Sequence, residues 1–194
     1  MNKYLRHPYR YSRIIFYYII GTTIGRLFYS HKLFNSRHFL SIGASGWKWV
    51  CISIIRQRLM GKNSHISWPC SPNILVTNGD NIIFDYDDLN NFWTLGNYYQ
   101  SFGNIYIGKG TYIAPNVGII TENHNLYNPD IKEIPCNVVL GEKCWIGMNS
   151  VILPGVTLGS HTIVGAGSVV TKSFPEGCCV IVGNPARKIK DLCI

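Results

Sequence analysis

The chain has 194 residues, a formal net charge of +8 and 46% hydrophobic residues. This length accommodates one domain with an extension, and the hydrophobic content is enough for a packed core. Its seven cysteines are an odd number without a C-x-x-C pair, which excludes a disulfide framework or a cysteine-ligated zinc site and indicates a reducing, cytoplasmic compartment.

The positive charge is concentrated in the first part of the chain. Residues 1–79 contain eleven Lys or Arg and no Asp or Glu, whereas residues 80–194 contain seven basic and ten acidic residues. The two parts therefore carry +11 and −3, which sum to the net +8. No nucleic-acid-reading motif accompanies the basic residues, so we expect no nucleic-acid partner.

Residues 1–60 are predicted to form a basic, aromatic, helical extension. Arg13 and Arg26 flank one apolar stretch, IIFYYIIGTTIG, and Trp47 and Trp49 precede a second, CISIIRQRL. Neither stretch approaches the roughly 20 apolar residues needed to span a bilayer. Basic and aromatic flanks are typical of helices on an anionic leaflet. Two interpretations stay open: peripheral association with the inner face of the cytoplasmic membrane, or packing on the rest of the protein or on a neighbouring subunit.

From residue 61 onward, short apolar pieces alternate with Gly, Asn and Pro, a pattern that favours entry into a solenoid. One register of period six runs through this region, with a single polar member: Ile83, Leu89, Leu95, Ser101, Ile107, Ile113 and Ile119. These coils are also rich in aromatic residues. Two interpretations stay open: the rings pack against the extension, or they form a platform that binds sugar rings.

Residues 140–174 have the clearest pattern in the chain. They divide into six blocks of six, LGEKCW, IGMNSV, ILPGVT, LGSHTI, VGAGSV and VTKSFP, each beginning with an aliphatic residue. A period of six fits neither an α-helix nor a simple strand, but it is typical of a parallel β-helix with three hexapeptides in each triangular coil. We therefore predict a mainly β fold, with the β-helix over residues 61–182 and a carboxy-terminal tail at 183–194.

The register is interrupted between Ile119 and Leu140, which are 21 residues apart, not a multiple of six. The polar segment TENHNLYNPDIKEIPCN, about residues 121–137, is predicted to leave the coil as a loop, and loops on rigid scaffolds often carry function. His124 lies near its start. Imidazole titrates nearest to neutral pH, and a positioned general base contributes about 10²–10⁴-fold to a rate. Glu122, an aspartate on an earlier coil or a backbone carbonyl would orient the ring.

Three segments together resemble the hexapeptide-repeat acyltransferases: IGKGTYIAPNVGIITENHNLY, CWIGMNSVILPGV and GAGSVVTKSFPEGCCVIVGNPARKIK. The resemblance implies a left-handed β-helix, a homotrimer, acetyl-CoA as the donor substrate and no metal. It is closest to O-acetyltransferases of colanic-acid and O-antigen type, whose acceptor is a sugar of a surface polysaccharide or its lipid-linked precursor. Two alternatives stay open: a small soluble acceptor (a free sugar, serine or an antibiotic), or a non-catalytic β-helix scaffold.

The resemblance also implies roles for individual residues. His124 would be the general base, in a loop where the family often has Pro after this histidine and this chain has Asn125. The acceptor side would include Asn97, Glu122 and Trp145. Small residues would let the pantetheine arm pass, and basic residues would hold the nucleotide phosphates. The expected donor-binding residues are Gly165, Ala166, Thr171, Lys172, Arg187 and Lys188. Some β-helical enzymes instead bind zinc through three histidines, but His124 and His161 in the repeat have no paired histidine on the adjacent side.

Overall fold

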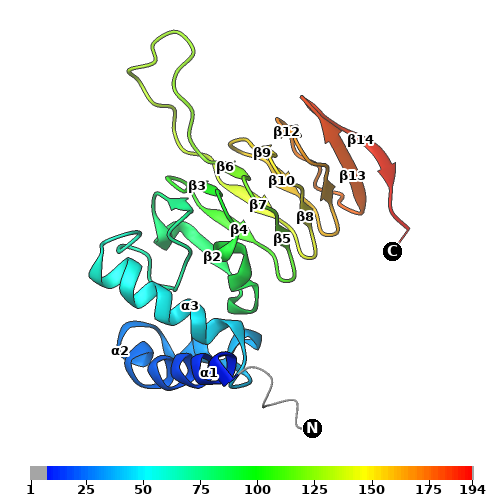
Figure 1. Cartoon of the computed structure of the whole chain (residues 1–194). Coiled ribbons are helices and arrows are strands. Elements are labelled where there is room, and N and C mark those ends of the chain that lie inside the picture. Colours follow the sequence, from blue (N-terminus) through cyan, green and yellow to red (C-terminus); the bar gives the residue numbers. More distant parts are fainter. Residues whose placement is uncertain (1–7, 194) are drawn as a thin grey trace. The chain divides into compact units, whose positions relative to one another are not determined.

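A computed structural model of the chain describes residues 8–193 (Figure 1). It comprises two compact units, Met1–Pro72 and Asn73–Ile194, called here the helical unit and the β-helical unit. The first seven residues of the predicted extension lie outside the described residues. The domain boundaries predicted at residues 60 and 182 stay predictions.

The helical unit is built on two helical segments and confirms that the amino-terminal region is helical. α1 (Pro8–Ile20) continues through a π-helical turn, η2 (Gly21–Gly25), into α2 (Arg26–Phe28). The second segment is α3 (Ser45–Ser53), which continues into the π-helical η5 (Ile54–Leu59). Two short 3₁₀ helices connect them, η3 (His31–Asn35) and η4 (Arg37–Phe39). Within residues 8–193, no helix combines the length and apolarity needed to cross a bilayer.

Two glycines let the helical segments approach closely. A Cβ atom on Gly21 would lie 2.6 Å from the Trp47 ring, and one on Gly25 would lie 2.6 Å from a Val50 methyl group. The rings of Tyr18 and Trp47 pack edge to face at 5.2 Å between centres. The two glycines of the GTTIG stretch therefore lie on the face of the first segment that packs on α3. Small residues four positions apart allow this close approach.

The β-helical unit contains three sheets, called here sheets A, B and C. Sheet A consists of β1, β3, β6, β9 and β12, sheet B of β2, β4, β7 and β10, and sheet C of β5, β8, β11, β13 and β14. From β3 to β12, successive strands enter A, B and C in turn, so each of these coils has three sides. The strands are β1 (Leu75–Val76), β2 (Ile82–Phe84), β3 (Tyr98–Gln100), β4 (Ile105–Ile107), β5 (Tyr112–Ile113), β6 (Gly118–Ile120), β7 (Val138–Leu140), β8 (Trp145–Ile146), β9 (Val151–Ile152), β10 (Thr157–Leu158), β11 (Ile163–Val164), β12 (Val169–Val170), β13 (Cys179–Gly183) and β14 (Ala186–Asp191).

The predicted hexapeptide register is confirmed where the repeat is strict. Paired residues on neighbouring coils, such as Trp145 and Ile163, are 18 positions apart, or three hexapeptides. The first residue of every block points inward and is at most 1% exposed: Leu140, Ile146, Ile152, Leu158, Val164 and Val170. Burial of these aliphatic side chains along the axis forms the core of the unit.

The predicted register is wrong at two places in the early coils. Ile83 and Leu95 are 45% and 60% exposed. Ile82, next to Ile83, pairs with Ile105, 23 positions later rather than 18. The 3₁₀ segment η7 (Tyr86–Trp93) lies between β2 and β3, so five extra residues shift the phase. From Ser101 onward the register holds, because Ser101, Ile107, Ile113 and Ile119 are all buried.

Two features depart from the regular wall. Gly118 on β6 pairs with Val151 on β9, 33 positions later, so this coil contains fifteen residues more than a regular one. They belong to residues 121–137, which project from the wall as an arm at the top of Figure 1. At the other end β13 and β14 pair antiparallel, so the predicted tail at 183–194 includes a strand.

Candidate active site

Where the arm leaves the coil, its two sides are joined by backbone hydrogen bonds, and these fix the backbone position of His124. His124 and Lys132 form an antiparallel bridge, and the amide of Glu133 donates to the carbonyl of Asn123 at 2.8 Å. Beyond the bridge, the amide of Asn125 donates to the carbonyl of Ile131 at 2.8 Å. His124 therefore belongs to a hydrogen-bonded segment, although its side chain is exposed.

The environment of the His124 ring determines which nitrogen carries the proton. Nδ1 lies 2.6 Å from the backbone carbonyl oxygen of Pro129. A carbonyl oxygen only accepts hydrogen bonds, so Nδ1 must be the donor and Nε2 keeps its lone pair in the neutral ring. A backbone carbonyl, one of the expected alternatives, thus orients the ring. In this tautomer Nε2 has the lone pair that a general base requires.

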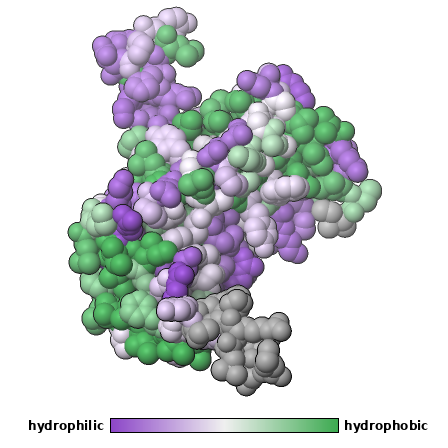
Figure 2. Space-filling view, viewed as in Figure 1, coloured by the Kyte–Doolittle hydropathy of each residue, from purple (hydrophilic) through white to green (hydrophobic). Residues whose placement is uncertain are grey.

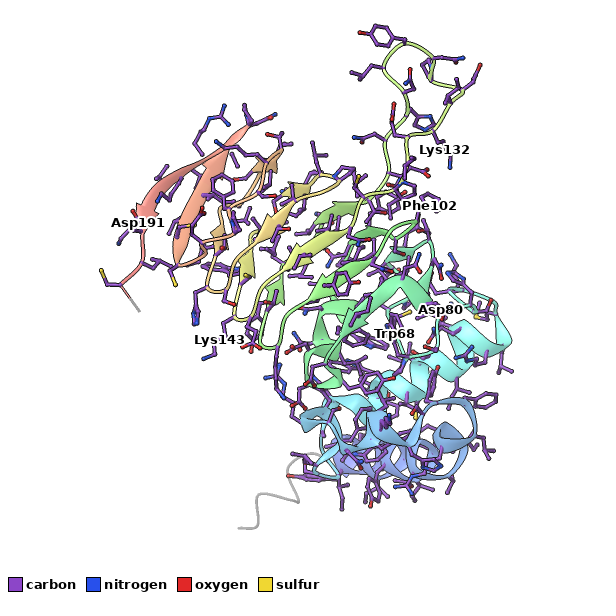
Figure 3. The ribbon with its side chains drawn as sticks, turned by 180° about the vertical axis from the view of Figure 1, so that it is seen from behind. Trp68, Asp80, Phe102, Lys132, Lys143 and Asp191 are labelled. Carbon is purple, nitrogen blue, oxygen red and sulfur yellow. The ribbon has the colours of Figure 1, made fainter. Side chains whose placement is uncertain are left out.

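Glu122 fixes the base of the arm through a different partner. Its carboxylate lies 3.0 Å from the ammonium of Lys132, and its side chain is only 11% exposed. The Lys132 ammonium also lies 4.5 Å from the centre of the Phe102 ring (Figure 3). The backbone amide of Glu122 donates to Gln100 Oε1 at 3.0 Å. These contacts connect both sides of the arm to the coil. Glu122 is two residues before His124, and Lys132 is its partner across the arm.

Asn97, expected on the acceptor side, lies inside the coil. It is 1% exposed. Its Oδ1 accepts from the amide of Val117 at 3.1 Å, and its Nδ2 donates to the hydroxyl of Tyr99 at 3.2 Å. Both ends of the amide group are used for internal hydrogen bonds, so we do not carry Asn97 into the proposed acceptor site.

Trp145 lies on the outer surface of sheet C and is 56% exposed. On neighbouring strands it pairs with Tyr112, which is also exposed, and with Ile163. The three side chains form an outward apolar ladder across β5, β8 and β11. An indole and a phenol on a flat sheet suit the apolar faces of a sugar ring or a pantetheine chain.

The small residues expected to line the donor groove lie at the corner between sheets C and A, after β11. A Cβ atom on Gly165 would lie 2.6 Å from a methyl group of Val182, so internal packing already requires glycine there. Ala166 and Gly167 are exposed, and Gly167 has open space around it. This corner therefore offers a bare backbone to a ligand.

The basic residues of the predicted donor site differ in their partners. Thr171 and Lys172 are exposed at the corner after β12, where the Lys172 ammonium lies 5.6 Å from the Phe174 ring centre. Lys188 pairs with Asp191 at 2.8 Å, and this hydrogen bond and charge raise the pKa of Lys188. Within the described part of the chain, Arg187 has no carboxylate partner; its guanidinium donates to the carbonyl of Ala186 at 3.1 Å.

One protomer does not bring all these residues together. The arm with Glu122 and His124 leaves the corner between sheets A and B, and Lys172 lies at the same edge two coils farther, about 10 Å along the axis. Trp145 and Arg187 lie on sheet C, the side opposite that corner in a three-sided coil. The predicted site is therefore divided between an edge and the opposite side.

Sequence reasoning missed Pro129 and Lys132. Both lie in the predicted loop, but their roles depend on which residues pair across the arm. The sequence of the arm has no alternation of apolar and polar residues that would set this pairing. Among residues 8–193, no group of three His, Cys, Asp or Glu side chains is placed to hold a metal ion.

Comparisons with known proteins agree with this architecture. Residues 137–172 match the family described as bacterial transferase hexapeptide (six repeats). The chain is 37% identical over 91 residues to galactoside O-acetyltransferase of Escherichia coli K12, covering 44% of this chain and 43% of that protein. It is also 37% identical over 102 residues to an E. coli K12 protein named "Putative lipopolysaccharide biosynthesis O-acetyl transferase WbbJ", covering 46% and 52%. The chain thus spans about half the length of these relatives.

A solved galactoside acetyltransferase in complex with coenzyme A is similar in structure. It superposes with a TM-score of 0.56 at 30% identity, covering 64% of this chain and 62% of the other. The predicted left-handed parallel β-helix is confirmed. In sequence and in fold, this chain resembles the hexapeptide-repeat acetyltransferases, among them proteins named as putative acetyltransferases of lipopolysaccharide and colanic-acid biosynthesis.

Proposed function

We propose that the chain is an O-acetyltransferase that moves the acetyl group of acetyl-CoA to a sugar hydroxyl, with His124 as the general base. The observation that carries the proposal is the orientation of the His124 ring, whose Nδ1 is held by the Pro129 carbonyl at 2.6 Å. Nε2 would take the proton of the acceptor hydroxyl as its oxygen attacks the thioester carbonyl. The carbon–sulfur bond then breaks, and the proton passes to the sulfur, so CoA leaves as the thiol. The Pro129 carbonyl would stabilise the imidazolium formed in between.

The exposed corner at Ala166 and Gly167 supports the binding of acetyl-CoA. A pantetheine arm needs a path without side chains, and this corner provides one beside the apolar ladder of sheet C. Arg187, which lacks a carboxylate partner among residues 8–193, suits bidentate binding of a nucleotide phosphate. Lys172, with Thr171 beside it, lies at the His124 corner and would add charge from the neighbouring protomer. Lys188 would contribute less because Asp191 already pairs with it.

We infer that the active protein is a homotrimer. The corner that carries His124 lies opposite the side that carries Trp145 and Arg187, so one protomer cannot place them around one substrate. A threefold arrangement would bring the corner of one protomer against sheet C of the next. The exposed ladder of Tyr112, Trp145 and Ile163 would then become part of a wall between protomers, with Glu122 beside His124 on the opposite wall.

As acceptor we propose a sugar of a cell-surface polysaccharide or of its lipid-linked precursor. Support comes from the relative named for lipopolysaccharide biosynthesis and from a basic, aromatic helical unit in the same chain, which suits a protein acting peripherally at the cytoplasmic face of a membrane. A second candidate is a small soluble sugar, because the chain also resembles a galactoside acetyltransferase.

Release of CoA thiol from acetyl-CoA, measured with purified chain and a panel of glycans and free sugars, tests the proposal. His124→Asn is the informative variant, because its amide can still donate to the Pro129 carbonyl while offering no base. We expect its turnover to fall by about 10²–10⁴-fold, with acetyl-CoA binding by calorimetry unchanged. A variant with undiminished turnover would overturn the assignment of the base. If no acceptor is acetylated and acetyl-CoA does not bind, the proposed activity itself is wrong.

Mass spectrometry separates the two acceptor classes. Surface glycan from cells with and without the chain is expected to differ by the mass of an acetyl group. Unchanged glycan together with robust acetylation of a free sugar would favour the soluble acceptor.

A further inference from the structure

The helical unit has a second apolar face that the structure leaves uncovered. Gly21 and Gly25 pack on α3, while the opposite side of the same segment exposes Ile15, Ile19 and Leu27 at 52%, 52% and 80%. These residues, with Thr23, follow an i, i+4 spacing and so share one stripe. We call Ile15, Ile19, Thr23 and Leu27 the apolar stripe. Phe16 and Phe28, 57% and 43% exposed, widen it.

The charge of the helical unit has a single sign. The unit contains no Asp or Glu, because the first acidic residue of the chain is Asp80. Arg26 immediately precedes Leu27 of the apolar stripe. Its guanidinium lies 5.7 Å from the centre of the Phe34 ring and, within the described part of the chain, has neither a hydrogen bond nor an ion pair. A partly exposed guanidinium without an anionic partner is available to an anion from outside the protein.

A cavity of about 310 Å³ lies beside Arg26 within the helical unit. Arg26 is the only charged residue that lines it, and most of the others are aromatic or aliphatic: Tyr18, Thr22, Phe34, Phe39, Leu40, Ser41, Ile42 and Trp47. Leu40 and Ile42 are 75% and 53% exposed. The size lies at the lower end of the range for small-molecule sites. The guanidinium of Arg26 at the side of this cavity suits a phosphate group.

We propose that the helical unit binds the surface of an anionic phospholipid bilayer, with the apolar stripe at the acyl boundary and Arg26 holding a lipid phosphate beside the cavity. Figure 2 shows hydrophobic residues gathered over the helical unit. An apolar face flanked only by positive charge matches the two components of an anionic leaflet, which offers hydrocarbon below a layer of phosphates. The inference deepens the peripheral membrane association named with the proposed acceptor, and it does not require acetyl transfer.

Flotation of the full chain with lipid vesicles tests this proposal without any enzymatic readout. The chain is expected to float with vesicles of phosphatidylcholine and phosphatidylglycerol, to float much less with phosphatidylcholine alone, and to be released as salt rises because the phosphates are screened. Failure to float with the anionic vesicles at low salt would overturn the proposal. Equal flotation with both lipids would overturn the role of charge.

Two matched leucines test the apolar stripe. Leu27→Ser is expected to weaken partitioning about tenfold, because a leucine is lost from the acyl boundary. Leu95→Ser, which removes an equally apolar side chain that is 60% exposed in the β-helical unit, is expected to change nothing. If Leu27→Ser instead lowers the oligomeric mass in sedimentation and leaves flotation intact, the stripe binds protein rather than lipid, and the proposal is wrong.

Three substitutions of basic residues test the phosphate site. Arg26→Gln should weaken binding about fivefold, the effect of one charge near an anionic surface, and Arg26→Lys should restore only part of it because the planar fork is lost. Lys62→Gln changes the net charge equally, but Lys62 does not line the cavity; a smaller loss is expected. Equal losses for Arg26→Gln and Lys62→Gln, or full binding by Arg26→Lys, would overturn the phosphate site at Arg26.

Discussion

Glycines at one corner of the coil show how single residues determine the stacking of the solenoid. Gly108, Gly141 and Gly159 follow β4, β7 and β10 at the corner between sheets B and C. A Cβ atom on Gly108 would lie 2.4 Å from the carbonyl carbon of Gly141, and one on Gly159 would lie 2.2 Å from the carbonyl oxygen of Pro175. These neighbours are backbone atoms, which cannot rotate away. Glycine is required here by the close approach of successive coils.

We predict that Gly159→Ala destabilises the β-helical unit by about 1–3 kcal/mol, the usual cost of overpacking, because the added methyl group must separate two coils. Denaturant unfolding followed by circular dichroism in the strand region measures the loss. The matched control is Gly43→Ala, since a Cβ atom on Gly43 would have no neighbour within 4 Å. Equal stability of the two variants would show that the coils at this corner are loosely packed.

At the scale of elements, the sequence predicts what is periodic and misses what is inserted. The strict repeat places every inward residue between Leu140 and Val170 correctly, because each block fills one side of a coil. The period-six register predicts inward positions for Ile83 and Leu95, but both side chains are exposed. The five extra residues around η7 shift the phase, and nothing in a period-six pattern marks where a 3₁₀ helix has replaced a side.

The candidate site was predictable to a similar degree. The broken period predicts the arm, and together with the family resemblance it predicts His124 as the base, which stays a prediction. The contact from Nδ1 to Pro129 depends on the fold-back of the arm, which leaves no trace in local composition. Asn97 shows where reasoning from residue type is weakest. The sequence places this polar residue on the acceptor side, whereas in the structure its amide group makes hydrogen bonds to Val117 and Tyr99 inside the coil. Burial of a single asparagine cannot be read from its residue type.

The arm is an element that the solenoid does not need for folding. We predict that deletion of residues 122–136 leaves the β-helical unit folded and abolishes acetyl transfer. The deletion shortens this coil from 33 to 18 residues, since Gly118 and Val151 then become 18 apart. It keeps Thr121, whose hydroxyl donates to the Gln100 carbonyl at 2.6 Å, and Asn137, whose Oδ1 accepts from the Asn104 amide at 2.9 Å.

The deletion variant is measured by thermal unfolding and by CoA release in parallel. The unfolding midpoint is expected to change little. Closing a shorter loop costs less conformational entropy, and no buried residue is removed. The matched control is His124→Asn in the full-length chain, which removes the base but keeps the arm. An unfolded deletion variant would show that the arm is part of the core, and an active one would place catalysis elsewhere.

At the scale of the whole molecule, a three-sided coil explains why the proposed catalyst needs more than one copy of the chain. An edge and the side opposite to it are separated by the full width of the coil, which the buried aliphatic axis fills. His124 lies at such an edge, and Ala166 lies at a different corner, between sheets C and A. These two corners are the two ends of sheet A and belong to different coils, so we propose that they act on one acetyl group from neighbouring protomers.

Mixing two inactive variants tests this division directly. His124→Asn removes the base, and Ala166→Trp fills the exposed corner proposed for the pantetheine arm; each is expected to be inactive as a homotrimer. After the two are unfolded and refolded together, about a quarter of the sites in randomly assembled trimers would combine an intact base from one protomer with an intact corner from its neighbour. CoA release should therefore recover to about that fraction of the wild-type rate. Mixing without refolding is the control and should stay inactive, and no recovery in trimers shown by mass to contain both variants would place the base and the corner in the same protomer.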